Sequence, residues 1–402
     1  MRPRILAFAY SILPGEGSES GSGWVWSRML AGIGDTWVVT RPFPGWKELQ
    51  VPALAKLPEC ERATLVYVDI PAWARRIGRP GSELFARVEY LIWQVVALRE
   101  ARRLNATSRF DIAWHLVYAN AWIGSLASLV GPPFVYGPVG GGVHPPWRLV
   151  ASLGLRGAGY EVLRAVARWA GRHLNPVAAV SWRRSRLILV QNRETRHWLP
   201  AAERHKAHVF PNAVLEENVG APPAPRHGRK LTALFAGRLL PLKGVSLAID
   251  AMALLPDWRL LVCGEGPDER RLRERASQRS PGRVSFLGWI PRPEVLRLMR
   301  EEADVLLFPS LHEEGCWTAA EAVAAGLPVV CLDVGGPAFL ASVAVRPGTP
   351  AETVRRLAAA VRVADTAPLI TAEMQLGPRR SRLRELLVGA GLRVSAERIE
   401  HQ

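Results

Sequence analysis

The residues best placed to do chemistry form a loop that contains two glutamates. Glu313 and Glu321 stand eight positions apart in the segment P-S-L-H-E-E-G-C-W-T-A-A-E-A, residues 309–322. A carboxylate that faces a cleft accepts hydrogen bonds from sugar hydroxyl groups. A local interpretation also exists, because Thr318 and Glu321 have the spacing of a capping box. Capping does not account for Glu313, so the loop favours a hydroxylated ligand.

Two cations follow an earlier apolar run. Arg238 and Lys243 stand in F-A-G-R-L-L-P-L-K-G, directly after the strand expected at Leu231–Ala236. Arginine presents a fork to phosphate oxygens, and lysine supplies a mobile point charge. A solvated basic loop is the alternative. The flanking glycines and the helix expected next favour an anion site.

A third loop is rich in glycine and joins the first expected strand to a helix. It reads P-G-E-G-S-E-S-G-S-G-W, residues 14–24, and contains Gly21 and Gly23. Glycines let backbone N–H groups approach a phosphate at a helix N-terminus. A tight turn without a ligand explains the pattern equally well, so both interpretations stay open.

These loops need sheets to position them, and apolar runs alternate with helical patterns along the whole chain. Such alternation predicts parallel sheets that are covered on both faces. Prolines in A-P-P-A-P, residues 221–225, indicate a linker between two α/β domains. We expect an N-terminal domain over 1–215, a linker over 216–230, a C-terminal domain over 231–376 and an Arg-rich tail over 377–402. The strands are expected at Ile5–Ala9, Thr36–Thr40, Leu65–Val68, Ile112–Leu116, Phe134–Tyr136, Leu187–Gln191, Leu231–Ala236, Arg259–Cys263, Val284–Leu287, Val305–Phe308 and Pro328–Leu332.

Composition narrows the class of protein and its partners. The 402 residues are 49% hydrophobic and 22% charged, which is a globular balance, and the four cysteines form no C-x-x-C pair. The net charge of +16 favours an anionic partner, although Arg-rich composition also follows from GC-rich coding. The sequence contains no D-x-D, no H-E-x-x-H and no aromatic-basic stacking motif. We therefore expect neither a metal site nor a nucleic-acid partner.

One basic segment suggests a membrane surface. Arg164, Arg168 and Arg172 recur every four residues and so share one face of the helix expected at 160–174. Either this helix covers the core as an ordinary surface helix, or it lies on an anionic bilayer. The uncharged stretch 112–147 is broken by glycines and prolines, so we expect buried strands there and no spanning helix.

The glutamate loop resembles the E-x7-E signature of retaining GT-B glycosyltransferases, especially glycosyltransferase family 4, also called group 1. The motif's usual tail is present as E-A-V-A-A-G-L-P-V-V, residues 321–330. The resemblance extends from about residue 5 to about residue 340. The other segments that carry it are Gly237-Arg238 with Lys243-Gly244, V-C-G-E-G-P at 262–267, F-L-G-W-I at 286–290, G-S-E-S-G-S-G-W at 17–24 and F-V-Y-G-P-V-G-G-G at 134–142.

The resemblance implies an α/β protein of the GT-B class, with two Rossmann-like domains that face each other across a cleft. It implies that Arg238 and Lys243 hold the departing diphosphate and that Glu321 holds the donor ribose. Glu313 would face the donor sugar, and His115 would stand close to the reacting sugar unless it is a buried structural histidine. The full set that the resemblance assigns to donor binding is Gly21, Gly23, Arg238, Lys243, Gly266, Ile290, Gly315, Cys316, Trp317 and Glu321.

The expected function is therefore sugar transfer from a nucleotide-sugar donor to a glycan or lipid-linked acceptor, with retention and without a metal or other cofactor. A nucleotide-sugar epimerase and a catalytically silent partner of a polysaccharide assembly complex are the alternatives. The expected location is cytoplasmic, with peripheral attachment to the inner face of the membrane as an open choice. The sequence departs from the family at its end, because no aromatic residue follows Phe339.

Overall fold

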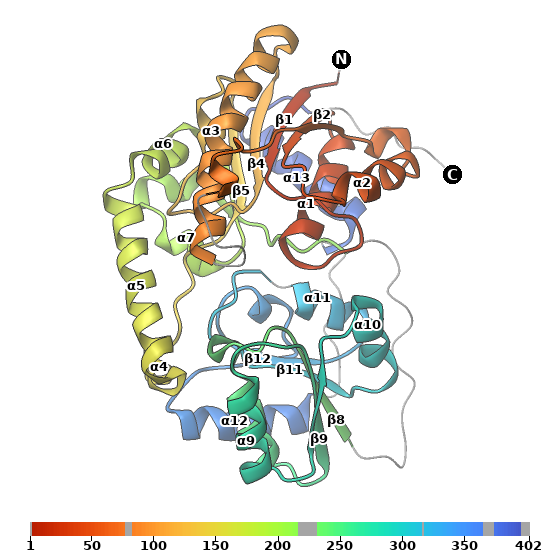
Figure 1. Cartoon of the computed structure of the whole chain (residues 1–402), viewed down its shortest axis with the longest axis vertical. Helices are drawn as coiled ribbons and strands as arrows, with labels where there is room; N and C mark the ends of the chain where they lie inside the picture. Colours follow the sequence, from red (N-terminus) through yellow and green to blue (C-terminus); the bar gives the residue numbers. More distant parts are fainter. Residues whose placement is uncertain (1, 77–82, 216–230, 316, 365–373, 395–402) are drawn as a thin grey trace. The chain divides into compact units, whose positions relative to one another are not determined.

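The computed structural model describes residues 2–76, 83–215, 231–315, 317–364 and 374–394, and it divides into two compact units (Figure 1). Unit 1 comprises residues 1–141, 168–214 and 375–402, and unit 2 comprises residues 142–167 and 215–374. The linker expected at 216–230 lies outside the described residues. The domain boundaries expected from the sequence stay a prediction.

Unit 1 is built on a parallel sheet with the strand order β3-β2-β1-β4-β5-β6-β7. The strands are β1 (Arg4–Ala9), β2 (Asp35–Thr40), β3 (Thr64–Tyr67), β4 (Ile112–Val117), β5 (Phe134–Val139), β6 (Ser185–Val190) and β7 (Ala207–Val209). The helices are α1 (Ser18–Ala31), α2 (Trp46–Ala55), α3 (Glu83–Ser108), α6 (Pro176–Arg184), α7 (Arg193–Trp198) and α13 (Leu376–Gly389). Its core contains the fully buried aromatic residues Phe8, Trp93 and Tyr136.

Unit 2 repeats the arrangement with the strand order β10-β9-β8-β11-β12-β13, again all parallel. The strands are β8 (Leu231–Ala236), β9 (Trp258–Cys263), β10 (Val284–Gly288), β11 (Val305–Phe308), β12 (Val329–Leu332) and β13 (Val343–Val345). The helices are α4 (Trp147–Val150), α8 (Val245–Ala253), α9 (Glu269–Arg279), α10 (Arg292–Glu301), α11 (Trp317–Ala324) and α12 (Pro350–Val363), while α5 (Gly154–His173) contributes residues to both units.

Both strand orders are of the Rossmann type, in which the first strand lies inside the sheet and the order reverses beside it. All eleven expected strands are present, ten of them within two residues of their predicted ends, while the strand predicted at Phe134–Tyr136 extends to Val139. The short edge strands β7 and β13 were not predicted, because three residues are too few to show an apolar pattern.

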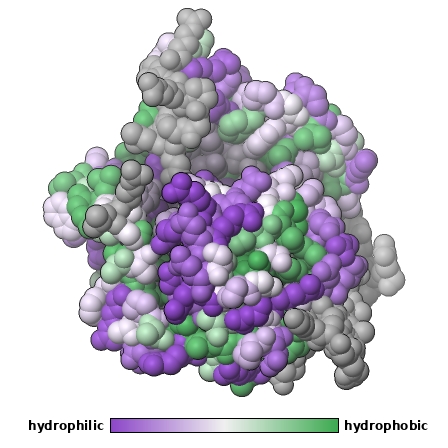
Figure 2. Space-filling model, turned by 60° about the horizontal axis from the view of Figure 1, so that its bottom comes forward, coloured by the Kyte–Doolittle hydropathy of each residue, from purple (hydrophilic) through white to green (hydrophobic). Residues whose placement is uncertain are grey.

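Much of the surface charge of unit 2 is held in local ion pairs. On and beside α9, Arg271 contacts Asp268 at 2.7 Å and Arg275 contacts Asp250 at 2.5 Å. Figure 2 shows hydrophilic side chains over much of the face that it presents, with hydrophobic patches between them. Many basic side chains of unit 2 are therefore paired with carboxylates and are not free cations.

The Arg-rich helix α13 packs in unit 1 beside α1, where Figure 1 shows it in blue among the first elements of the chain. Arg380 and Arg28 both contact the Glu61 carboxylate, each at 2.7 Å. The Arg379 guanidinium lies 4.0 Å from the centre of the Phe210 ring. Arginine pairing and stacking thus attach this helix, which carries no aromatic residue of its own.

Glu61→Gln should destabilise unit 1 by about 1.5–3 kcal/mol, the usual contribution of a hydrogen bond to a charged group. Burial raises the pKa of Glu61, but the hydrogen bonds from Arg380 and Arg28 outweigh burial and the pKa lies below its ordinary value. The stabilisation is therefore present above the unfolded-state pKa and is lost as the pH falls through the folded-state pKa. Chemical unfolding at neutral and acidic pH measures the difference.

Glu59→Gln is the matched control, because Glu59 is exposed in the same short 3-10 helix. It should leave stability nearly unchanged at every pH. A loss in Glu61→Gln that stays constant down to the acid range would contradict the role of this carboxylate.

Candidate functional site

The loops of unit 2 that carry the expected site leave the sheet at its carboxyl edge. Residues 237–244 follow β8, and residues 309–316 follow β11. These two strands are neighbours, and the chain leaves them in opposite directions along the sheet. Open α/β sheets bind ligands at such a switch point.

At this point the structure brings the expected cation and carboxylate together. The Lys243 Nζ donates to Glu313 Oε2, and both side chains are largely buried, with 21% and 25% of their area exposed. The Leu311 N–H donates to the Leu242 carbonyl oxygen at 2.8 Å, which joins the two loops through their backbones. Arg238 lies in the same first loop and is exposed. A positive and a negative group are thus held side by side without a ligand.

Two glycines allow these loops to approach each other. Gly244 has φ +69°, and a Cβ at that position would lie 2.0 Å from the Pro309 carbonyl oxygen. Gly335, after β12, has φ +67°, and its Cβ would lie 2.0 Å from the Glu313 carbonyl oxygen. Sequence reasoning missed Gly335, whose signal is a Gly-Gly pair shortly after an expected strand.

Glu321 lies in α11 and is 9% exposed. The Arg292 Nε, at the start of α10, donates to Glu321 Oε1 at 2.6 Å. Because α11 begins at Trp317, Thr318 is already helical and the capping-box interpretation of Glu321 is wrong. Sequence reasoning also missed Arg292, which stands only two positions after the expected Ile290.

The remaining donor-side residues of unit 2 lie on neighbouring loops. Gly266 packs against the first loop so closely that a Cβ would lie 2.4 Å from the Leu239 carbonyl oxygen. Ile290 follows β10 and is half-buried, and Gly315 lies in the loop before α11, which begins at Trp317. Cys316 lies outside the described residues.

Gly21 and Gly23 lie inside α1, in unit 1. A Cβ on Gly21 would lie 1.8 Å from the Glu16 carbonyl oxygen, and one on Gly23 would lie 2.3 Å from the Ser11 carbonyl oxygen. Close packing of the helix on its preceding loop therefore accounts for both glycines. Their expected contact with the donor stays a prediction.

His115 is fully buried in β4. Its Nδ1 lies 2.5 Å from Ser125 Oγ, and its Nε2 lies 2.9 Å from the Tyr90 hydroxyl oxygen and 3.1 Å from the Val117 carbonyl oxygen. Burial lowers the pKa of His115 to about 4, so the ring is neutral at pH 7. Both ring nitrogens have protein partners, which favours the structural interpretation over a contact with the reacting sugar.

Polar side chains that the sequence did not single out gather at the carboxyl edge of the unit 1 sheet. Arg41, just after β2, donates to the Tyr10 hydroxyl at 2.6 Å and to Glu89 at 2.9 Å. Tyr118, just after β4, has φ +55° and donates its N–H to Glu19 Oε2 at 3.0 Å. Only the rule that ligands bind at strand carboxyl ends would have found them.

Burial changes the ionisation of two groups in this cluster. Burial raises the pKa of Glu19, although the hydrogen bond from the Tyr118 N–H opposes the change. Burial, together with the negative charge of Glu19, raises the pKa of Tyr118 to about 12. Tyr118 is nonetheless 41% exposed, so part of this residue is accessible to a ligand.

Of the two interpretations that the sequence left open for α5, the contacts of its three arginines favour the ordinary surface helix over a helix that turns these arginines to a bilayer. Arg168 is 3% exposed, Arg164 contacts Glu161 at 2.9 Å, and the Arg172 guanidinium donates to the Trp198 carbonyl oxygen. The outward face is apolar instead, because positions two residues away point in the opposite direction on a helix. Its exposed residues are Val162, Leu163, Val166 and Trp169.

Two searches of the described residues are negative. No group of three or more His, Cys, Asp or Glu side chains could hold a metal ion in the part of the chain that the structure describes. No helix among the same residues is both long and apolar enough to cross a bilayer.

Comparison with known proteins shows that the C-terminal segment is similar to a known family. Residues 222–356 match the model of the glycosyl transferases group 1, which confirms the resemblance drawn from the motifs. The chain is 30% identical to 2-deoxystreptamine glucosyltransferase of Streptomyces kanamyceticus over 243 residues, which is 54% of this chain and 58% of that protein. It is 36% identical to D-inositol 3-phosphate glycosyltransferase of Jonesia denitrificans over 164 residues, 35% of this chain and 38% of that protein. These alignments cover less than two thirds of either relative.

Solved structures support the fold over nearly the whole chain. The apo lipopolysaccharide outer core galactosyltransferase WaaB has a TM-score of 0.64 at 12% identity and covers 96% of this chain and 99% of its own. Anabaena Alr3699/HepE, solved with UDP and glucose, has a TM-score of 0.58 at 16% identity and covers 96% of this chain and 100% of its own. The expected GT-B class, with two Rossmann-like domains, is confirmed.

Gly244→Ala should destabilise unit 2 more than Gly282→Ala. Both glycines have φ near +70°, so each substitution incurs the left-handed penalty of about 1–2 kcal/mol. Gly282 has open space around its Cβ position, whereas Gly244 meets the Pro309 carbonyl. Overpacking should add about 1–3 kcal/mol to the loss in Gly244→Ala alone. Chemical unfolding of both variants gives the difference, and equal losses would mean that the two loops do not need their close approach.

Proposed function

We propose that this chain, a GT-B-fold protein whose residues 222–356 match the group 1 glycosyl transferases, transfers a sugar from a nucleotide-sugar donor to a hydroxyl-bearing acceptor. The observation that carries the proposal is the meeting of Lys243 and Glu313 at the switch point of unit 2, with Arg238 on the same loop.

The chemistry of sugar transfer suits this arrangement. The bond between the anomeric carbon and the diphosphate oxygen breaks, and a bond from the acceptor oxygen to that carbon forms. Negative charge then develops on the diphosphate and positive charge on the sugar. Fixed cations stabilise the leaving group without a metal, so Arg238 and Lys243 would bind the diphosphate oxygens. The acceptor proton would pass to the departing diphosphate, and retention of configuration remains part of the proposal.

The two glutamates would then have different roles. Lys243 would exchange Glu313 for the incoming diphosphate, which would release the Glu313 carboxylate toward the donor sugar. Glu321 would accept hydrogen bonds from the donor ribose. Its ion pair with Arg292 at 2.6 Å would hold this nearly buried carboxylate in place for the ribose hydroxyls. Gly315, Cys316 and Trp317 would present backbone groups to the sugar or phosphate.

The relatives support this donor chemistry. Anabaena Alr3699/HepE was solved with UDP and, separately, with UDP-glucose, so a related fold binds a nucleotide-sugar. The curated relatives are named as transferases, which gives no support to an epimerase or to a silent partner.

For the acceptor, we place recognition at the carboxyl edge of the unit 1 sheet. Arg41, Glu89, Glu19 and the Tyr118 hydroxyl supply donors and acceptors there, and the exposed part of Tyr118 is accessible to a sugar ring. Hydroxyl groups on a glycan or on a lipid-linked sugar would satisfy such a set equally well.

We also propose peripheral attachment to a membrane through the apolar face of α5. Val162, Leu163, Val166 and Trp169 are between 56% and 65% exposed and lie on one side of the helix. Interfacial helices insert such a face into the boundary of the bilayer, and tryptophan favours that depth. This replaces the electrostatic attachment expected from the arginines.

Arg238→Ala should weaken binding of a nucleoside diphosphate about ten- to a hundredfold, because a charge-assisted hydrogen bond contributes about 1.5–3 kcal/mol. Glu313→Gln should bind the same nucleotide at least as tightly as the parent, since Lys243 then loses its competing carboxylate, yet sugar transfer should fall. Calorimetry with a panel of nucleoside diphosphates, followed by a turnover assay with the matching nucleotide-sugars, measures both effects.

Arg270→Ala is the control, because the Arg270 side chain is 93% exposed on α9. Its affinity for the nucleotide should equal that of the parent. If Arg238→Ala and Arg270→Ala behave alike, the assigned diphosphate site is wrong. Turnover without transfer to any acceptor would favour the epimerase.

Val166→Ser with Trp169→Ser should reduce sedimentation with phosphatidylglycerol vesicles. Because insertion is apolar, binding of the parent should persist at about 1 M salt, where charges are screened beyond about 3 Å. Leu49→Ser with Val51→Ser on α2 is the matched control, because these side chains are also more than half exposed. Complete release by salt, or an unchanged Val166→Ser/Trp169→Ser variant, would contradict attachment through α5.

A further inference from the structure

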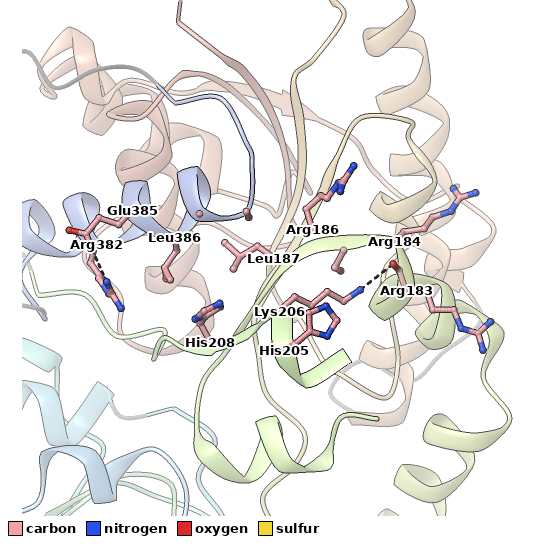
Figure 3. Close-up of a pocket in the computed structure, with 13 residues that line it drawn as sticks. Arg183, Arg184, Arg186, Leu187, His205, Lys206, His208, Arg382, Glu385 and Leu386 are labelled. Atoms are coloured by element: carbon pink, nitrogen blue, oxygen red, sulfur yellow. Dashed lines mark hydrogen bonds and ion pairs between the residues drawn. The ribbon is translucent and has the colours of Figure 1, made fainter. Parts of the chain in front are cut away.

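A basic pocket of about 710 Å³ opens in unit 1, and none of the residues assigned to sugar transfer lines it (Figure 3). One wall comes from α13, which contributes Arg382, Glu385 and Leu386. The other comes from the start of β6 and from the residues around the start of β7. Figure 3 shows these two walls with Leu187 between them. The lining side chains from the second wall include Arg183, Arg184, Arg186, Leu187, His205, Lys206 and His208.

The charged side chains that line the pocket are mostly positive. The lining holds four arginines and one lysine against a single carboxylate, Glu385, which contacts Arg382 at 2.6 Å. Lys206 contacts Glu203 at 2.6 Å and donates to the Arg183 carbonyl oxygen at 3.2 Å. In the part of the chain that the structure describes, the other three arginines make no ion pair with a carboxylate. Three guanidinium groups therefore retain donors for an added anion.

The arginines of the second wall are consecutive or nearly so, and the fold keeps them together. Arg183 and Arg184 end α6, and Arg186 follows in β6. The Arg184 guanidinium reaches the Ser128 carbonyl oxygen at 3.3 Å, which leaves most of its five donors unused. His208 lies among these cations. Burial lowers its pKa, and the charges of Arg196 and Arg382 lower it further, as expected in a positive field.

The position of the pocket separates it from the proposed reaction. Residues 183–187 and 205–208 lie at the amino ends of β6 and β7. All strands of this sheet are parallel, so these residues lie at the edge opposite to Tyr10, Arg41 and Tyr118, which follow carboxyl ends. Ligands of the reaction are expected at the carboxyl edge. A ligand in this pocket would therefore be neither the reacting donor nor the reacting end of the acceptor. It would be another molecule, or a distant part of a long acceptor.

We propose that this pocket binds an anion with two or more phosphate groups and thereby links α13 to the start of β6 and β7. Arginine forks suit phosphate oxygens, and cations on two facing walls need an anion with more than one charged group to be neutralised together. A soluble polyphosphate and the phosphorylated headgroup of a lipid share this chemistry. The inference does not depend on the proposed sugar transfer.

The test uses the full chain with Arg238→Ala and Lys243→Ala, so that the assigned diphosphate site of unit 2 does not contribute. Inorganic tripolyphosphate is titrated by calorimetry at physiological ionic strength. In parallel, phosphatidylcholine vesicles with and without phosphatidylinositol 4-phosphate are sedimented with the protein. Arg184→Gln with Arg186→Gln should weaken binding of the effective probe about ten- to a hundredfold.

Arg103→Gln with Arg270→Gln is the charge-matched control, because both side chains are exposed and lie on α3 and α9. Arg382→Gln on the opposite wall provides an independent variant if the first pair lowers the melting temperature. Loss of tripolyphosphate binding alone would identify a soluble ligand, and loss of vesicle binding alone a lipid headgroup; either supports the site. Equal effects of the pocket and control variants, or no binding of either probe, would overturn it.

Discussion

The reversal of strand order between β8 and β11 is the constraint on which the proposed chemistry depends. It makes two loops diverge from neighbouring strands, so that Lys243 and Glu313 meet although they stand seventy positions apart. A lysine buried beside a carboxylate is neutralised without a ligand and still retains two further N–H donors. The same geometry therefore neutralises the lysine and suits it to exchange one anion for another.

Glycines set how closely the loops around this pair can approach. Gly244 and Gly335 each let a backbone carbonyl come within 2.0 Å of where a Cβ would stand. Gly244 brings the lysine loop against the Pro309 carbonyl, and Gly335 brings the chain after β12 against the Glu313 carbonyl. The position of Lys243 and Glu313 thus depends on backbone packing. Even a methyl group added at Gly244 or Gly335 would displace the loops that carry them. Rigid placement of this kind is what electrostatic stabilisation of a leaving group requires.

The sequence predicted the fold well because most of the eleven predicted strands are buried and produce strong apolar runs, whereas β3 and β10 are only partly buried. It located the loops of unit 2 because their motifs are local. It did not predict features that arise from tertiary packing. Arg292 reaches Glu321 only after α10 packs beside α11, and Tyr118 meets Glu19 from a loop that is distant in the chain. The sequence left the orientation of α5 open for the same reason. A helical pattern shows that a helix has two different faces, but it does not show which face is buried. In α5 the arginines are on the buried side, where Glu161 pairs with Arg164 and the Trp198 carbonyl accepts from Arg172.

The pairing of the arginines also differs from one surface of this strongly basic chain to another. On α9 and at Glu61, arginines are matched by nearby carboxylates and contribute to folding. At the start of β6 the chain places three of them together with a single carboxylate on the facing helix. These three arginines repel one another, while α13 presents the Arg382–Glu385 ion pair to them and is secured near its other end by Arg380 and Glu61. An anion that contacts both Arg382 and the arginines at the start of β6 would bind only while α13 is docked, so occupancy and the docking of α13 should stabilise each other.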